Sequence, residues 1–304
     1  MKQVLITGEN SYIGNAIAAY LQEYRTIDQE TSLPAYQVTK ISLRDDGWEA
    51  QDFSAFDVVL HVAGKAHVDV SGASQEEQES YYRVNAGLVK KVAEKAKQQG
   101  VKQFVHFSSV IVYGDSAKVG QTKHITQDTI PTPSNFYGDS KLKGEEGLVP
   151  LADETFQVAM LRLPFVYGKG CKGNYPLLVK LAEKLPVFPD IGNERSMLYI
   201  ENLTEFVRQI IDKGQGGLFF PQNGEYVTTA RMVAQIGQAK GKKVRLVKWL
   251  CPLVVLAGKM PGKIGRLADK AFGSLTIDRS LSDLGDNSYR KYSLEESIRR
   301  IHED

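Results

Sequence analysis

Short apolar runs alternate with amphipathic segments along the first half of the chain. Short, mostly apolar runs occur at residues 2–7, 58–63, 104–108 and 158–163, and a further strand is expected near residues 36–43. Between them, Ile13, Ile17 and Leu21 recur at helical spacing, and a charged, helix-prone segment runs over residues 76–98. Strands that alternate with helices are typical of a parallel sheet with helices on both faces. The pattern therefore predicts an α/β fold with a doubly wound parallel sheet.

The second half of the chain is less regular. Residues 164–200 are rich in Pro and Gly, and a capping box at 293–296 (Ser-Leu-Glu-Glu) opens a final helix. The intervening elements are expected as follows: helices near 175–185, 202–213 and 233–240, and a short strand at 217–220. We expect one domain over residues 1–165, with later segments returning to its sheet, and a smaller mixed α/β lobe over residues 166–304.

Charge is balanced over the whole chain but not locally. The 304 residues carry a formal charge of +2, which gives nucleic-acid binding no support. Residues 240–279, however, hold ten Lys or Arg against two Asp. Two explanations are open: a solvated surface, or an anionic partner such as a diphosphate or a membrane surface. Within residues 245–272, Trp249 and the leucines that follow it suit a helix that lies at a membrane interface. The alternative is that this segment packs on the second lobe or on a neighbouring subunit, as in a homodimer.

Cysteine and histidine usage predicts no metal and no disulfide framework. Cys171 and Cys251 show no ligand spacing. The five histidines form no tight ligand set; they are His61, His67, His106, His124 and His302. The longest apolar stretch, 250–258, is too short to span a bilayer. With no signal-peptide pattern at the start, a reducing cytoplasmic location is expected.

A glycine-containing turn, Thr7-Gly8-Glu9-Asn10-Ser11-Tyr12-Ile13-Gly14, follows the first strand. Such a turn presents backbone amides to a pyrophosphate at a helix N-terminus, where the helix dipole favours anions. Gly8 would make the tight turn, Gly14 would let the helix pack closely, and Ser11 replaces the usual middle glycine. Plain strand–helix packing is the alternative. Because the turn directly follows a strand, we predict that a Rossmann-type dinucleotide site includes Gly8, Asn10, Ser11, Tyr12, Ile13 and Gly14.

Cofactor choice depends on the end of the second strand, Ile41-Ser42-Leu43-Arg44-Asp45. A carboxylate there would bind the ribose hydroxyls of NAD, whereas Ser42 and Arg44 suit a 2′-phosphate. NADP(H) is therefore favoured. Asp45 and Asp46 keep NAD(H) open.

Three side chains suit proton transfer at a carbinol oxygen. Tyr137 and Lys141 lie four positions apart, on one helix face, and Ser109 follows the strand at 104–108. Tyr137 would act as general acid/base, with its pKa brought toward working pH by the Lys141 ammonium and the positively charged nicotinamide. Ser109 would hold the substrate oxygen, and Lys141 would also contact the cofactor ribose. A surface Tyr/Lys pair is the default alternative.

These motifs together resemble the extended short-chain dehydrogenase/reductases of the nucleotide-sugar epimerase/dehydratase group. The matching segments span nearly the whole chain: Thr7-Gly8…Gly14, His61-Val62-Ala63-Gly64, Asn85, Ser108–Gly114, Tyr137…Lys141, Leu161-Arg162…Val166-Tyr167-Gly168 and Arg195…Tyr199–Leu203. The resemblance implies that Ala63 and Gly64 line the cofactor and that Asn85 supports the active-site strand ends. It also implies that Asn174 and Arg195 contact the diphosphate of a UDP-sugar, although Arg195 could instead form a surface salt bridge.

The resemblance narrows the reaction. Dehydratases of this group carry an Asp and a Glu after the active-site serine or threonine, where this chain has Val110 and Ile111. Two apolar side chains cannot protonate a leaving hydroxyl, so we do not expect 4,6-dehydration. The chain is most similar to bacterial 4-reductases of UDP-4-keto-6-deoxy-N-acetylhexosamines, which serve polysaccharide biosynthesis. The alternatives are a UDP-hexose or UDP-N-acetylhexosamine 4-epimerase and a non-catalytic dinucleotide-binding sensor.

Overall fold

The computed structural model describes residues 1–28, 31–66, 72–285 and 288–303. The chain forms two compact units, each assembled from separate segments. Unit 1 comprises Met1–Gly114, Pro131–Leu163 and Thr204–Phe220, and unit 2 comprises Asp115–Ile130, Pro164–Leu203 and Pro221–Asp304.

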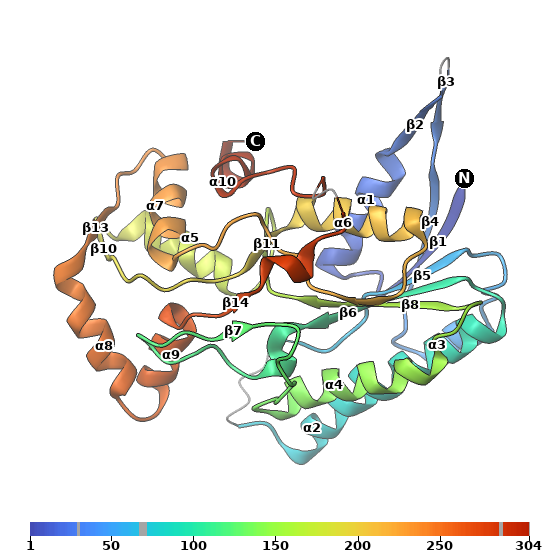
Figure 1. The fold of residues 1–304 in the computed structure, drawn as a ribbon, viewed down its shortest axis with the longest axis horizontal. Helices are drawn as coiled ribbons and strands as arrows, with labels where there is room; N and C mark the ends of the chain where they lie inside the picture. Colours follow the sequence, from blue (N-terminus) through green and yellow to red (C-terminus); the bar gives the residue numbers. More distant parts are fainter. Residues whose placement is uncertain (29–30, 67–71, 286–287, 304) are drawn as a thin grey trace. The chain divides into compact units, whose positions relative to one another are not determined.

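Unit 1 is built on a six-stranded parallel sheet of order β12-β8-β6-β5-β1-β4 (Figure 1). Its strands are β1 (Lys2–Thr7), β4 (Tyr36–Ile41), β5 (Val58–His61), β6 (Gln103–Ser109), β8 (Gln157–Leu163) and β12 (Gly217–Phe219). β4 adds to one side of β1 and β5 to the other, so the direction of winding reverses between β1 and β5. This sheet confirms the predicted fold class, and its switch point is where such folds bind ligands.

Helices cover both faces of this sheet. Figure 1 shows α1 (Tyr12–Glu23) and α6 (Ile200–Lys213) on one face and α2 (Gln75–Tyr82), α3 (Val89–Gln98) and α4 (Phe136–Leu148) on the other. The helix predicted over 76–98 is present, but α2 and α3 are joined by a π-helical turn, η2 (Arg83–Leu88). A hairpin of β2 (Arg25–Asp28) and β3 (Thr31–Pro34) was not predicted.

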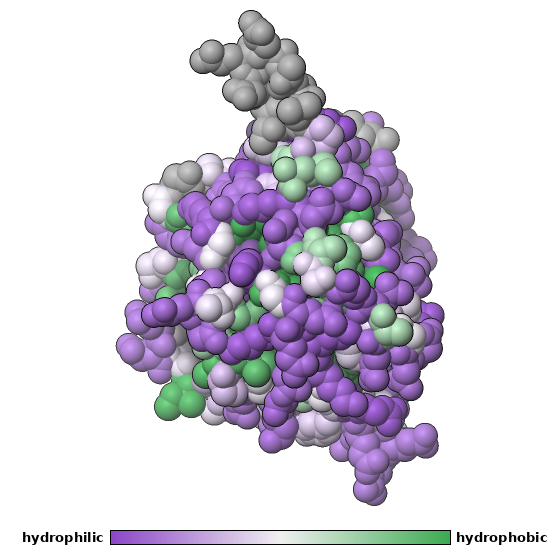
Figure 2. Space-filling view, turned by 90° about the vertical axis from the view of Figure 1, so that its right-hand side faces the viewer, coloured by the Kyte–Doolittle hydropathy of each residue, from purple (hydrophilic) through white to green (hydrophobic). Residues whose placement is uncertain are grey.

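Alternation along the strands gives the sheet two apolar faces. Leu5, Val59, Phe104 and Val158 occupy equivalent positions on neighbouring strands and pack against the buried residues of α3. These α3 residues are Val89, Val92, Ala93 and Ala96. The molecular face shown in Figure 2 is mostly hydrophilic, with apolar residues in small separate groups, as expected for a folded protein surface.

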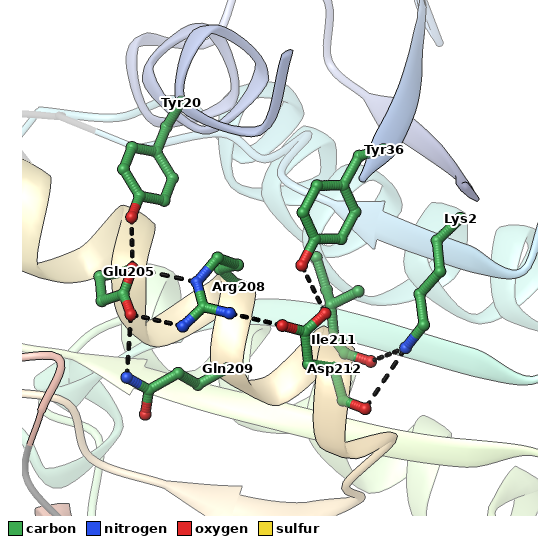
Figure 3. A network of polar contacts seen from close by, with 8 residues as sticks. All are labelled: Lys2, Tyr20, Tyr36, Glu205, Arg208, Gln209, Ile211 and Asp212. Carbon is green, nitrogen blue, oxygen red and sulfur yellow. Dashed lines mark hydrogen bonds and ion pairs between the residues drawn. The ribbon is translucent and has the colours of Figure 1, made fainter. Parts of the chain in front are cut away.

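Polar contacts attach α6 to the opposite face of the sheet (Figure 3). Arg208 forms ion pairs with Glu205 (2.6 Å) and Asp212 (2.5 Å). Tyr20 of α1 donates a hydrogen bond to Glu205, and Tyr36 of β4 donates one to Asp212. We call these five residues the α6 network; it connects a helix from late in the chain to the first elements of the sheet.

Unit 2 contains short strands paired with distant partners, and five helices. The parallel pairs are β9 (Phe165–Tyr167) with β11 (Met197–Tyr199), β10 (Val187–Pro189) with β13 (Arg245–Val247), and β7 (His124–Ile125) with β14 (Thr276–Ile277). The helices are α5 (Asn174–Lys184), α7 (Thr229–Ala239), α8 (Cys251–Lys259), α9 (Lys263–Phe272) and α10 (Leu294–Glu303). The predicted capping box is confirmed, because Ser293 N–H donates to Glu296 and Glu296 N–H donates to Ser293 Oγ. Within the described ranges, no helix is long and apolar enough to cross a membrane.

Candidate functional site

The turn after β1 lies at the switch point of the sheet. Gly8 has φ +92°, and a Cβ there would lie 2.9 Å from the backbone nitrogen of Ala63. The N–H groups of Gly8 and Glu9 both donate to Ile41 O, at 3.0 and 3.3 Å. The turn thus joins the ends of β1, β4 and β5 so closely that only glycine fits, and the predicted Asn10 is exposed at its tip.

The first turn of α1 follows directly. Ser11 is the N-cap, and its Oγ accepts a hydrogen bond from Gly14 N–H (3.2 Å). A Cβ on Gly14 would lie 3.3 Å from Ile6 Cγ2, so the helix packs tightly on β1. The N–H groups of the first helical turn have no acceptor inside the helix and are suited to an anion. They include those of Tyr12 and Ile13.

The end of β4 presents a cation rather than a carboxylate. Arg44 is exposed and makes no ion pair with any residue the structure describes. Its N–H donates to Ser42 Oγ (3.3 Å). Asp45 is engaged locally, because its Oδ1 accepts from Gly47 N–H (3.0 Å) and caps a short 3-10 helix. In this segment Asp45 is therefore engaged in a local cap, whereas the Arg44 guanidinium makes no ion pair with any described residue.

The loop after β5 is held against α4 by the buried Asn85. Its Oδ1 accepts from Lys65 N–H (2.8 Å), and its Nδ2 donates to Lys65 O (2.9 Å) and Ser140 Oγ (3.0 Å). A Cβ on Gly64 would lie 3.0 Å from Lys141 Nζ. These contacts place the Ala63–Lys65 loop beside the Lys141 ammonium.

Asn85 sits in the π-helical turn η2, which the sequence did not reveal. A Cβ on Gly144 of α4 would lie only 2.2 Å from Asn85 O, so the backbones of α4 and η2 are in direct contact. π turns occur frequently at functional sites. Here the turn directs Asn85 to the loop after β5.

Ser109 and Tyr137 meet at the carboxyl end of β6. Ser109 Oγ caps η3 (Val110–Tyr113) by accepting from Ile111 N–H (3.2 Å), and the Ser109 and Tyr137 side chains are hydrogen bonded. A Cβ on Gly138 would lie 2.7 Å from Ile111 O, so α4 begins directly against η3. This close approach is what brings the phenol to the serine.

Lys141 is buried one helical turn further along α4. Its Nζ donates to Phe107 O (3.1 Å). Burial lowers the pKa of Lys141 to about 8, although Glu145 acts in the opposite direction. Burial, followed by the nearby Tyr81, raises the pKa of Tyr137 to about 12, against the hydrogen bond with Ser109. Burial therefore favours the neutral form of both groups in these surroundings.

A buried ion pair supports this cluster and was missed in the sequence. Arg162 of β8 binds Glu145 of α4 (Nη2–Oε2 2.6 Å), and Arg162 Nη1 donates to Tyr113 OH (2.5 Å). Ser108 Oγ also donates to Glu145. Glu145 follows Lys141 by four positions and so shares its helix face, which is the signal that could have identified it.

Tyr81 of α2 is a second missed neighbour. Its ring is fully buried, packs edge-on against Tyr137 (centroids 5.9 Å apart), and carries Lys65 Nζ 4.8 Å above its face. Its hydroxyl makes no hydrogen bond with the described part of the chain. No sequence pattern distinguishes this tyrosine from an ordinary core residue.

Two of the histidines form a fully buried pair beneath the cluster. His61 and His106 lie with ring centroids 5.9 Å apart, and His61 Nδ1 is hydrogen bonded to Thr7 Oγ1 (3.0 Å). Burial lowers the pKa of His61 to about 3 and that of His106 well below its usual value. Across the described residues no group of three metal-binding side chains occurs. The remaining histidines are His124 and His302, in unit 2, and His67, which lies outside the described residues.

The two predicted diphosphate contacts belong to unit 2. Arg195 is half-buried, its Nη2 donates to Ser116 Oγ (2.7 Å), and no described carboxylate pairs with it. The surface salt bridge considered from sequence is thus not formed. Asn174 is half-buried at the start of α5, after Gly173 with φ +94°. All other predicted site residues lie in unit 1.

The chain matches a known family and known relatives over most of its length. Residues 4–219 match the NAD dependent epimerase/dehydratase family. It is 30% identical over 305 residues to a UDP-glucose 4-epimerase of Vibrio cholerae, covering 92% of this chain and 88% of that protein. It is 27% identical over 288 residues to an N-acetyl-alpha-D-glucosaminyl-diphospho-ditrans,octacis-undecaprenol 4-epimerase of Escherichia coli O157:H7, covering 90% and 83%.

A solved structure shares the fold. The UDP-glucuronic acid 4-epimerase of Bacillus cereus, in complex with NAD, superposes with a TM-score of 0.70 at 18% identity, covering 99% of this chain and 97% of that one.

Proposed function

Because the chain belongs to the NAD dependent epimerase/dehydratase family, we propose that it catalyses hydride transfer at C4 of a sugar linked to a diphosphate. NAD or NADP is the cofactor, unit 1 holds the dinucleotide, and unit 2 holds the sugar nucleotide. The observation that carries this proposal is the meeting of Ser109, Tyr137 and Lys141 beside the switch point of the sheet.

The residues at the switch point fit a dinucleotide. At Gly8 and Gly64 a Cβ would fill the space that a close-lying ligand needs, and the first turn of α1 offers N–H groups to a pyrophosphate. When bound, the nicotinamide accepts or returns the hydride. The chain's own residues then have to bind the sugar and handle the hydroxyl proton.

Tyr137 handles that proton. As the phenolate it accepts the proton of the C4 hydroxyl when the alcohol is oxidised, and as the phenol it returns that proton to the 4-keto oxygen when the sugar is reduced. Burial raises the pKa of Tyr137 and favours the phenol, so forming the phenolate needs a nearby positive charge. Ser109 Oγ holds the same substrate oxygen. The pKa of Lys141 is about 8, and its ammonium group is placed to stabilise the phenolate when it forms.

For the finer reaction, 4-epimerisation is the main proposal. Two relatives that align with nine-tenths of this chain are 4-epimerases, one on UDP-glucose and one on a polyprenyl-diphosphate sugar. This reverses the preference for a reductase drawn from sequence alone. Val110 and Ile111, which follow Ser109 in η3, provide no acid or base for 4,6-dehydration, so we propose that dehydration does not occur.

A second candidate, reduction of a UDP-4-keto-6-deoxy-N-acetylhexosamine, is favoured by the end of β4. Arg44 makes no ion pair with the residues that the structure describes, and Asp45 caps a short 3-10 helix; a guanidinium placed this way suits the 2′-phosphate of NADPH. A single reductive step that consumes NADPH would fit this arrangement.

One assay separates these candidates. Purified protein is incubated without reductant with UDP-glucose, UDP-N-acetylglucosamine or polyprenyl-diphosphate N-acetylglucosamine, and separately with the 4-keto-6-deoxy UDP-sugar plus NADPH. A C4 epimer from any of the first three substrates establishes the epimerase. Stoichiometric NADPH loss in the last reaction establishes the reductase. Dinucleotide binding with no product in any reaction would support a non-catalytic sensor instead.

Arg44 supplies an independent test of cofactor choice. The Arg44→Ala variant should weaken NADPH binding by about tenfold or more and leave NADH nearly unchanged, since a charged hydrogen bond to phosphate is worth about 1.5–3 kcal/mol. Titration calorimetry with both cofactors measures this, with Arg83→Ala, another exposed arginine, as the matched control. Equal losses for the two cofactors would show that Arg44 does not bind the 2′-phosphate.

A further inference from the structure

The segment from Lys248 to Phe272 in unit 2 forms a helical hairpin, α8–α9, that exposes large apolar side chains. Trp249 is 67% exposed, Leu256 61% and Leu267 63%. Further exposed apolar residues of the same hairpin are Leu253, Val255, Met260 and Ile264. Single exposed apolar residues need no explanation, but such a concentration within one short segment does.

The exposed apolar side chains follow helical spacing. Trp249, Leu253 and Leu256 are separated by four and three positions, and Ile264 and Leu267 by three. Such positions share one side of a helix. The turn before α8 together with α8, and α9 by itself, therefore each expose apolar side chains on one side; we call these two sets the apolar stripes.

The same hairpin carries unpaired positive charge. No ion pair within the described ranges engages any of its exposed cations. These cations are Lys248, Lys259, Lys263, Arg266 and Lys270. The only carboxylate between Lys248 and Phe272 is Asp269, and its Oδ1 accepts a hydrogen bond from Val119 N–H (2.8 Å). The positive charge of the hairpin thus has no local counter-charge.

Close backbone packing fixes the hairpin. A Cβ on Gly265 would lie 2.1 Å from Met260 O, and one on Gly273 would lie 2.0 Å from Ala117 O. α9 is therefore packed against the end of α8 and against another segment of unit 2. The exposed apolar side chains therefore belong to helices that are packed in unit 2.

We propose that the α8–α9 hairpin docks the protein on an anionic lipid bilayer, with the apolar stripes in the interface and the lysines and arginine on the headgroups. Charge complementarity selects this partner, because each basic side chain of the hairpin is attracted to the negative charge of an anionic membrane surface. Leucine, isoleucine and tryptophan side chains can enter the boundary between headgroups and acyl chains. Neither helix is long enough to span a bilayer, so the hairpin lies on the surface. This inference is independent of the reaction at C4.

The test uses the full chain and vesicles of phosphatidylcholine with and without phosphatidylglycerol. Cosedimentation should show binding to the anionic vesicles only, and weaker binding at high salt. Lys263→Glu with Arg266→Glu, and separately Leu253→Ser with Leu256→Ser, should each lower the partition coefficient by at least about tenfold. In a Trp48→Phe background, the emission of Trp249, then the only tryptophan, should shift to the blue and be quenched by brominated lipid.

Matched controls change equally exposed residues outside the hairpin. Ile130→Ser with Val149→Ser, and Lys102→Glu with Lys143→Glu, should bind vesicles like the parent chain. Circular dichroism and dinucleotide binding establish that every variant is folded. The proposal is overturned if the parent chain ignores anionic vesicles, or if control and hairpin variants lose binding equally. It is also overturned if light scattering shows a dimer that the leucine variant dissociates while no vesicle binding occurs, because the hairpin would then be a contact between two copies.

Discussion

Two polar clusters in unit 1 handle charge in opposite ways. In the α6 network, Arg208 pairs with both Glu205 and Asp212, and two tyrosines donate to the same carboxylates. Hydrogen bonding to Glu205 raises the pKa of Arg208. In the catalytic cluster, the buried Lys141 donates only to a backbone carbonyl and Tyr137 bonds to a neutral hydroxyl, so burial disfavours the charged form of both.

The difference indicates what each cluster is for. Groups that stabilise a fold are best held in one charge state by strong partners, whereas groups that move protons need states of similar free energy. The α6 network is of the first kind and the Ser109, Tyr137 and Lys141 set is of the second. The predictions below test this division, from the largest expected effect to the smallest.

Removing one hydroxyl from each cluster should separate activity from stability. Tyr137→Phe should lower turnover about a hundred- to ten-thousand-fold, because the acid/base group is lost, with cofactor binding retained. Tyr36→Phe should leave turnover unchanged and lower the free energy of unfolding by about 1 kcal/mol. Steady-state kinetics and urea denaturation measure both. Near-normal turnover in Tyr137→Phe would remove it from the reaction.

Breaking the ion pairs of the α6 network should act on stability alone. Arg208→Ala leaves the buried Glu205 without its charge partner and should lower the free energy of unfolding by about 3 kcal/mol. Lys97→Ala, which breaks a more exposed pair with Asp153, should cost less than about 1 kcal/mol. Equal losses in urea denaturation, or a fall in the turnover of folded Arg208→Ala, would contradict the division.

The buried histidines beneath the catalytic cluster should make the protein sensitive to acid. His106 is neutral when folded but gains a proton when unfolded below its ordinary pKa, so stability falls as pH drops below about 6.5, by about 1.4 kcal/mol per pH unit. The His106→Leu variant lacks this contribution. Between about pH 6.5 and pH 5, its free energy of unfolding should fall by about 2 kcal/mol less than that of the parent chain. Denaturation curves at both values test this. The His124→Leu variant, which removes an exposed imidazole of β7, is measured in parallel as the matched substitution outside the buried pair.

The lysine should set the alkaline limit of activity. Because its pKa is lowered to about 8, Lys141 loses its charge as pH rises through that value, and kcat/KM should fall by about tenfold per pH unit above it. The pH dependence of kcat/KM measures this limb in the free enzyme. A profile that stays flat well beyond it would show that turnover does not need the Lys141 charge.

Sequence patterns predicted the elements whose burial is local and continuous. The strands β1, β5, β6 and β8 of the central sheet are mostly apolar runs, and α1 has one apolar stripe, so each could be recognised alone. The two- or three-residue strands of unit 2 could not, because pairing with distant segments defines them. The β2–β3 hairpin, whose strands are neighbours in the chain, was missed because residues 25–34 are not an apolar run.

The residues of the candidate site also fall into those that the sequence could predict and those that it could not. Ser109, Tyr137 and Lys141 were recognisable by residue type and spacing. Gly138 and Gly144 were not, since their role is to let backbones approach Ile111 and Asn85, which only the folded chain brings near. Arg162 and Glu145 likewise form one ion pair across two elements.

The π-helical turn η2 has a consequence for insertions and deletions. A π turn contains one residue more than the α-helical turn it replaces. Losing a single codon there, for example that of Gly87, would restore a regular α-helix from α2 through α3. Because the wide turn absorbs its extra residue, α2 and α3 would keep the faces that they present to the rest of unit 1. The deletion would shift the residues of the turn itself, so Asn85 would lose its hydrogen bonds to Lys65 and Ser140 while both helices stay intact.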